Sequence, residues 1–127
     1  MRREFERKKE EFCKKGVPDK PIITYHGTKK ANIEAITASN FDMKFAVRQV
    51  HGPGNYFSED PKTALSYSDD KKQLIVAEIL PGLSYSGAAL SWPQYDSKVV
   101  EPGKDGYSQM VIIQDSSQIL PVAVINF

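Results

Sequence analysis

The chain has 127 residues and a formal net charge of only +1, which predicts one domain and gives no electrostatic sign of a membrane or nucleic-acid partner. No run of about 20 apolar residues is present, so we expect no membrane-spanning helix, and the charged first residues do not resemble a secretory signal. Cys13 is the only cysteine, which excludes an internal disulfide. We therefore expect an intracellular protein, cytoplasmic or nuclear, with no metal site.

Residues 2–15 predict a solvated helix, because acidic and basic side chains recur at the spacing of helical ion pairs. Phe5 and Phe12 share one face of that helix and would dock it onto the rest of the domain. Gly16 can end the helix, and Pro18 follows at the distance typical of a helix end. The alternative interpretation of this segment is a basic surface for an acidic partner.

Residues 22–25 form a β-branched and aromatic run, which predicts a strand. Thr28 is a candidate N-cap for a short helix that would turn Ile33 and Ile36 inward. Residues 40–50 show no clear hydrophobic period, so we expect a loop there.

The second half of the chain is richer in strands. Residues 55–58 predict a short strand, and Asp60 and Pro61 predict the N-cap and first position of a helix that ends near Ser68. A loop-rich stretch is expected at 81–102, and further strands at 73–80, 110–113 and 119–127. Because strands outnumber helices and do not alternate with them, the sequence predicts an α+β fold in a single domain, 1–127.

Three features could form a ligand site on physical grounds. His26 ends a strand beside Gly27, so its imidazole and nearby backbone groups could face a ligand, although a structural histidine is the alternative. The turn at residues 52–54 could hold a phosphate, but it lacks the rest of a P-loop or dinucleotide motif and could be a simple turn. Tyr56 and Tyr67 could stack on a flat ring, or they could pack in the core.

Taken in chain order, three segments resemble the catalytic signature of PARP-type (poly(ADP-ribose) polymerase-like) ADP-ribosyltransferases. They are Tyr25-His26-Gly27-Thr28, Gly52-Pro53-Gly54-Asn55-Tyr56-Phe57-Ser58 and Ala64-Leu65-Ser66-Tyr67-Ser68. Residues 115–127 resemble the closing strand pair of that family, so the likeness covers 20–127, with 1–18 as an added charged helix. The resemblance implies the fold of the family, two packed and mostly antiparallel sheets with a few peripheral helices.

The resemblance also implies NAD⁺ as the co-substrate. His26 would bind the adenine-side ribose, the Gly27 backbone would hold the nicotinamide carboxamide, and Thr28 would approach the nicotinamide-side ribose. Tyr67 and Tyr56 would stack on the two faces of the nicotinamide ring, where a cationic ring adds cation–π attraction. The other residues that the resemblance places at NAD⁺ are Gly54, Phe57, Ala64 and, as an adenine or phosphate contact, Arg48.

Two positions depart from the family pattern. Ala64 stands where the family usually has a serine that helps to hold the carboxamide, so we expect weaker NAD⁺ binding. Poly-forming members carry a glutamate at the start of the penultimate strand, and that position falls on Met110, or on Gln109 if the strand slips by one residue. Neither side chain offers the fixed anion that stabilises an oxocarbenium-like transition state.

The expected function is therefore mono-ADP-ribosylation, in which nicotinamide is released and ADP-ribose passes to a protein side chain or to a nucleic-acid end. His26, Tyr67 and whichever of Gln109 and Met110 replaces the glutamate are the expected catalytic positions. The first alternative is an inactive PARP-like module that binds NAD⁺, ADP-ribose or a protein partner. The second is an unrelated interaction domain.

Overall fold

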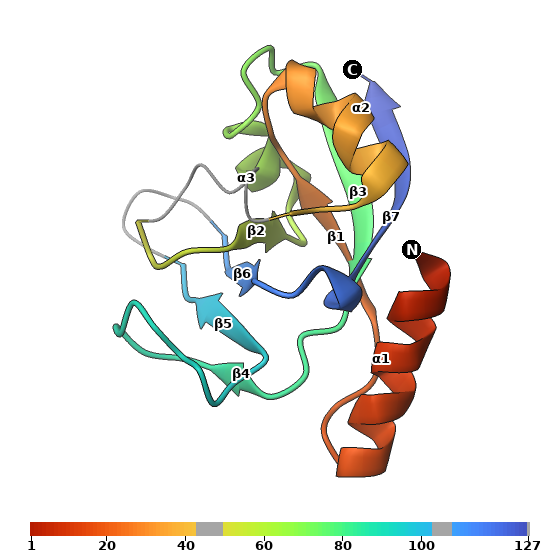
Figure 1. Cartoon of the computed structure of the whole chain (residues 1–127). Coiled ribbons are helices and arrows are strands. Elements are labelled where there is room, and N and C mark those ends of the chain that lie inside the picture. Colours follow the sequence, from red (N-terminus) through yellow and green to blue (C-terminus); the bar gives the residue numbers. More distant parts are fainter. Residues whose placement is uncertain (43–49, 103–107, 127) are drawn as a thin grey trace.

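The computed structural model of the chain describes residues 1–42, 50–102 and 108–126 (Figure 1). The helices are α1 (Arg2–Lys15), α2 (Lys30–Ser39), α3 (Pro61–Leu65) and the short 3₁₀ helix η2 (Ser116–Gln118). The strands are β1 (Ile22–His26), β2 (Asn55–Ser58), β3 (Gln73–Ile79), β4 (Ser84–Tyr85), β5 (Ser97–Val100), β6 (Met110–Ile113) and β7 (Ile119–Asn126). The predicted α+β class is confirmed.

All seven strands belong to one mixed sheet, in the order β4-β5-β6-β2-β1-β3-β7. Every neighbouring pair is antiparallel except β4 with β5. The expectation of two packed sheets is therefore corrected to one sheet. Its two halves are held together between β1 and β2 by a single residue pair, Tyr25 with Ser58, whereas β1 pairs with β3 along its whole length.

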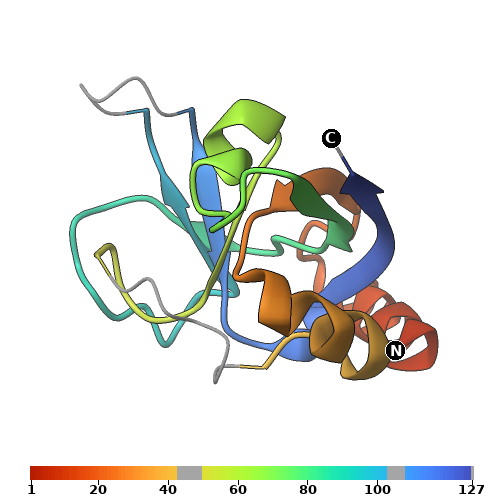
Figure 2. The ribbon, with the colours of Figure 1, turned by 90° about the horizontal axis from the view of Figure 1, so that it is seen from above.

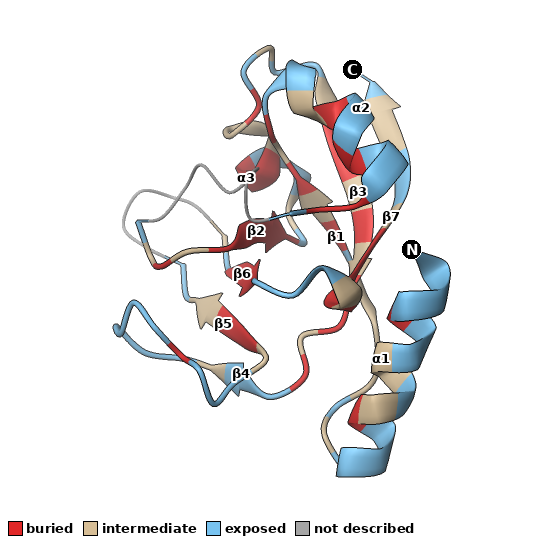
Figure 3. Cartoon of the chain, viewed as in Figure 1, coloured by how far each residue is buried: buried red, intermediate tan, exposed pale blue. Residues whose placement is uncertain are grey.

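The main core lies between α2 and the sheet. Ile33 and Ile36 of α2 pack on Phe57 of β2 and on the apolar side chains of β3 and β6. Seen from above, α2 and α3 lie on opposite sides of the strands (Figure 2). The buried residues accordingly follow the strands and the inward face of α2, as Figure 3 shows.

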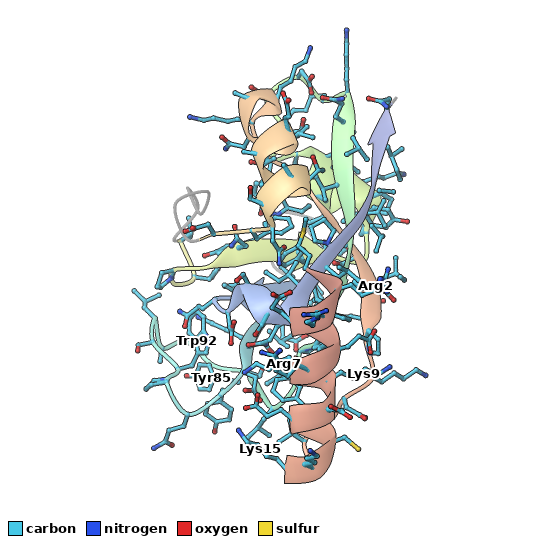
Figure 4. The ribbon with its side chains drawn as sticks, turned by 45° about the vertical axis from the view of Figure 1, so that its right-hand side comes forward. Arg2, Arg7, Lys9, Lys15, Tyr85 and Trp92 are labelled. Atoms are coloured by element: carbon cyan, nitrogen blue, oxygen red, sulfur yellow. The ribbon has the colours of Figure 1, made fainter. Side chains whose placement is uncertain are left out.

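The helix at the start of the chain docks as predicted. Phe5 and Phe12 are buried with Leu80 and Leu120 in a separate small cluster. Gly16 ends the helix in a left-handed conformation with φ 71°. The charged side chains labelled along α1 in Figure 4 project from the helix, while Lys8 forms ion pairs with Glu11 and with Asp115 beyond the helix.

Several element predictions need correction. Thr28 is not the N-cap of α2, because the helix begins at Lys30 and its N-cap position, Lys29, makes no side-chain capping bond. Asp60 does cap α3, with its carboxylate accepting from the Lys62 amide, but that helix ends at Leu65 rather than near Ser68. The stretch 81–102, expected to be loop-rich, contains the strands β4 and β5.

In the part of the chain that the structure describes, no helix is both long enough and apolar enough to cross a membrane. Within those same residues, no group of three or more histidine, cysteine, aspartate or glutamate side chains is arranged to hold a metal ion.

Candidate functional site

Beyond the pair of Tyr25 with Ser58, the strands β1 and β2 separate, and we call this separation the divide between the two halves of the sheet. In an antiparallel ladder, hydrogen-bonded pairs recur every second residue, so the next pair would join Gly27 with Tyr56. Instead, Nδ1 of the His26 side chain donates a hydrogen bond to the Tyr56 carbonyl oxygen, at 2.7 Å. The ladder stops there, and the Gly27 N–H and C=O are left without a hydrogen bond to any described residue.

His26 is a buried and neutral histidine. Its ring lies 4.8 Å from the Phe41 ring and 5.3 Å from the Phe57 ring, centroid to centroid. Burial lowers the pKa of His26 to about 4, although the hydrogen bond to the Tyr56 carbonyl acts in the opposite direction. Because a carbonyl only accepts, Nδ1 carries the proton, and Nε2 is a buried acceptor with no partner among the described residues.

Gly27 is a glycine because α3 approaches it closely. A Cβ at this position would collide with the Ala64 carbonyl oxygen and lie 3.1 Å from the Ser68 amide nitrogen. The close approach of a ligand, which the sequence suggests as the reason for this glycine, is not needed to explain it, because packing against α3 already excludes a side chain here. That packing nevertheless brings Gly27 beside the segment that carries Tyr67.

Tyr56, Tyr67 and Met110 meet on one side of the sheet. Tyr67 is partly buried against a cluster that contains Tyr56, Met110, Ile112 and Trp92, and its hydroxyl lies 3.2 Å from the Met110 sulfur. The Tyr56 hydroxyl donates to the Gly52 carbonyl at 2.7 Å and accepts from the His51 amide at 3.0 Å. The turn before β2 thus fixes the orientation of the Tyr56 ring.

Of the two positions that the resemblance aligns with the family's glutamate, Met110 contacts the Tyr67 hydroxyl. Met110 begins β6, opposite Ser58 of β2, and is buried. Gln109 is exposed, and its amide lies 3.4 Å from both carboxylate oxygens of Glu101. Gln109 also borders a cavity of about 360 Å³ whose other lining residues are Glu59, Asp60, Ser108 and Val111.

The predicted site residues border the divide from two faces of the sheet. Successive residues of a strand point to opposite faces, so Phe57 and the His26 ring lie on the α2 side, and Tyr56 lies on the other side with Tyr67. The three side chains at 26, 56 and 67 therefore do not form one slot. His26 and Tyr56 are linked only through the hydrogen bond of His26 Nδ1 to the Tyr56 backbone carbonyl, whereas Tyr67 packs with the Tyr56 side chain on the other face.

The remaining predicted residues have structural surroundings of their own. Thr28 is buried, and its hydroxyl accepts from the Asn32 amide at 3.4 Å. Gly54 has φ 147°, and a Cβ there would collide with the Ile112 side chain. Ala64 is buried against Gly27. Arg48 lies outside the described residues.

Lys98 is not among the residues that the sequence predicts for this site, yet its side chain bonds to the turn that holds Tyr56. It is only 3 % exposed, and its ammonium donates to the carbonyls of His51 and Ala89 at 2.7 and 2.8 Å. It also lies 5.5 Å from the centre of the Trp92 ring. A lysine in a β-branched strand is a weak signal, and its buried position follows only from the tertiary fold.

Comparison with known proteins assigns the chain to no group. No protein-family model matches it, and no curated protein matches it either.

Proposed function

We propose that this chain is a PARP-type ADP-ribosyltransferase domain that binds NAD⁺ and transfers single ADP-ribose units to a protein acceptor. The observation that supports this proposal best is the divide between β1 and β2, where Gly27 presents a backbone N–H and C=O that bond to none of the described residues. Nicotinamide carries a planar carboxamide with one acceptor and two donor hydrogens, which complements such a backbone pair.

The arrangement suits an extended ligand with two different ends. The His26 ring and Tyr67 lie on opposite faces of the sheet. In the proposed complex they contact opposite ends of NAD⁺. The buried Nε2 of His26 accepts a ribose hydroxyl on the adenine side. On the other side, Tyr67 stacks on the nicotinamide ring. The Tyr56 ring, fixed by the turn before β2, packs in the same cluster as Tyr67 and holds it in position.

In the proposed reaction, the bond between the ribose carbon and the nicotinamide nitrogen breaks, and nicotinamide leaves with the bonding electrons. The acceptor atom then bonds to that carbon and gives up its proton to the solvent or to a base of the acceptor. Met110, beside the Tyr67 hydroxyl, offers no charge to stabilise the developing cation. This favours single transfer over polymer synthesis, and it equally favours the second candidate, an inactive module that only binds NAD⁺.

Thermal unfolding tests the binding step. A ligand that binds the folded chain raises the melting temperature, by an amount equivalent to about 2.7 kcal/mol at a concentration 100 times its Kd. We expect NAD⁺ and a nicotinamide mimic each to raise the melting temperature of the chain, and we expect the substitution Tyr67→Ala to abolish that rise. Tyr95→Ala is the matched control, since Tyr95 is exposed and its ring packs on Tyr85.

Absence of any rise with millimolar NAD⁺ would contradict the proposal. Binding without transfer of labelled ADP-ribose to the chain itself or to lysate proteins would identify the inactive module.

A further inference from the structure

The strand β7 forms one edge of the sheet, and among the described strands it pairs with β3 alone (Figure 1). The strand at the opposite edge, β4, has only two residues, and a short strand protects a sheet edge against pairing with another chain. β7 has eight residues. Alternate residues of β7 therefore direct their backbone N–H and C=O groups away from β3, toward no other described strand.

The side chains of β7 give its edge little protection. No residue of the strand is charged, and every side chain before Asn126 is apolar. Natural edge strands often carry a lysine, a proline or a bulge that prevents pairing. Pro121, which has no N–H, and a bulge opposite Val76 and Ala77 of β3 protect the first half of the strand. The segment 122–126 has neither device.

The segment 122–126 is also accessible. Val122 is 43 % exposed, and Ala123 and Asn126 are exposed as well. Val124 packs against the main core on the α2 side of the sheet, so Ala123 and Ile125 lie on the opposite face. An apolar strand with exposed side chains and free backbone groups thus lies at the surface of the molecule.

A second copy of the same strand is the partner that suits this edge. A charged partner strand would gain no ion pair here, whereas two uncharged strands meet without repulsion between like charges. A twofold axis through the sheet at Val124 places this residue opposite its own copy. The same axis places Ala123 opposite Ile125 of the second copy, and Val122 opposite its Asn126. Apolar side chains then meet apolar side chains at the centre of the contact, which stabilises strand pairing.

We propose that the chain forms a homodimer in which the two β7 strands pair antiparallel, so that one continuous sheet crosses both copies. The dimer is closed, because the contact uses the β7 edge of each copy. In the strand order, β3 and β1 separate β7 from the divide. The dimer therefore leaves the candidate site of each copy open, and the inference does not depend on the proposed function.

Sedimentation of the full chain from micromolar to millimolar concentration tests the dimer. The unsubstituted chain should form a dimer that dissociates on dilution. Val122→Lys should raise the dimer Kd about tenfold or more, because a lysine on an edge strand opposes pairing. Ile23→Lys is the matched control and should keep the dimer, since Ile23 is 52 % exposed but lies on β1, inside the sheet. Circular dichroism checks that both variants are folded.

Disulfide cross-linking tests the register of the two strands. Cys13→Ala first removes the native thiol, which is exposed. In that background, a mixture of Val122→Cys chains and Asn126→Cys chains should form linked dimers, whereas either variant alone should link far less. Directly opposed residues of an antiparallel pair have Cα atoms about 4.5–5.5 Å apart, within the range of a disulfide.

Three results would each overturn the inference. They are a chain that stays monomeric at millimolar concentration, open-ended aggregates in place of a dimer, and equal loss of the dimer in Val122→Lys and Ile23→Lys. Linking of either cysteine variant alone, as strongly as in the mixture, would overturn the register. A monomer that still binds NAD⁺ would leave the proposed function standing.

Discussion

At the scale of single residues, the protonation of His26 links the candidate site to stability. The pKa of His26 is about 4 in the fold, compared with about 6.5 for an unperturbed histidine. Protonation therefore favours the unfolded chain. The contribution of His26 to stability is complete above pH 6.5 and is lost as the pH falls toward 4.

We expect the free energy of unfolding to fall by about 3 kcal/mol between pH 6.5 and pH 4 through this one group. Urea denaturation across that range measures the slope. The variant His26→Gln retains an amide that can donate to the Tyr56 carbonyl but does not titrate, so its slope in this window should be much smaller. An equal slope in both proteins would show that His26 is not buried in the neutral form.

At the scale of elements, the strand β5 fixes the turn before β2, next to Tyr56, through the side chain of Lys98. Its ammonium joins the turn before β2 to the segment after β4 through the carbonyls of His51 and Ala89. The same turn fixes the Tyr56 hydroxyl. The short strand β5, which the sequence does not predict, thus helps to position Tyr56, which the sequence does predict as a site residue.

The variant Lys98→Met should lower the free energy of unfolding by about 2 kcal/mol or more, because it removes the two charge-assisted hydrogen bonds that the buried ammonium donates to the His51 and Ala89 carbonyls. Chemical denaturation measures the loss, and Lys98→Arg, which keeps the charge and the donors, should recover part of it. A change below about 0.5 kcal/mol, as for an ordinary surface site, would contradict the buried position of Lys98.

At the scale of the whole molecule, α1 is part of the folded unit. It contributes Phe5 and Phe12 to a cluster with Leu80, which directly follows β3, and Leu120, near the start of β7. Unfolding of α1 alone would expose both phenylalanines. We therefore expect α1 and the sheet to unfold together rather than in separate steps.

Phe12→Ala should cost about 3–5 kcal/mol of stability, the usual range for a buried phenylalanine. Cys13→Ala is the control in the next position, where the thiol is exposed, and it should change stability by less than about 0.5 kcal/mol. Single coincident transitions by fluorescence and circular dichroism would support one cooperative unit. A small loss for Phe12→Ala would show that α1 is only loosely attached.

Local signals in the sequence predicted the elements that depend on nearby residues. The charge spacing and Gly16 predicted α1, the pair Asp60 and Pro61 predicted the start of α3, and apolar runs predicted β3, β6 and β7. Weak local signals failed, as at Thr28 and in the segment that became β4 and β5. Those two strands exist because β4 pairs with β5 and β5 pairs with β6.

The sequence by itself determined the α+β class, the docking of α1 by two phenylalanines, and the placement of Met110 at the start of β6, since each depends on periodicity or order along the chain. Only the tertiary structure decided that the strands form one sheet, not two, and that β1 and β2 separate after a single pair. It alone brought Tyr67 to Met110 and buried the Nε2 of His26 and the Oδ1 of Asn55 where no described residue bonds to them. Such contacts join residues far apart in sequence, and their geometry depends on the packing of the whole chain, which no local pattern records.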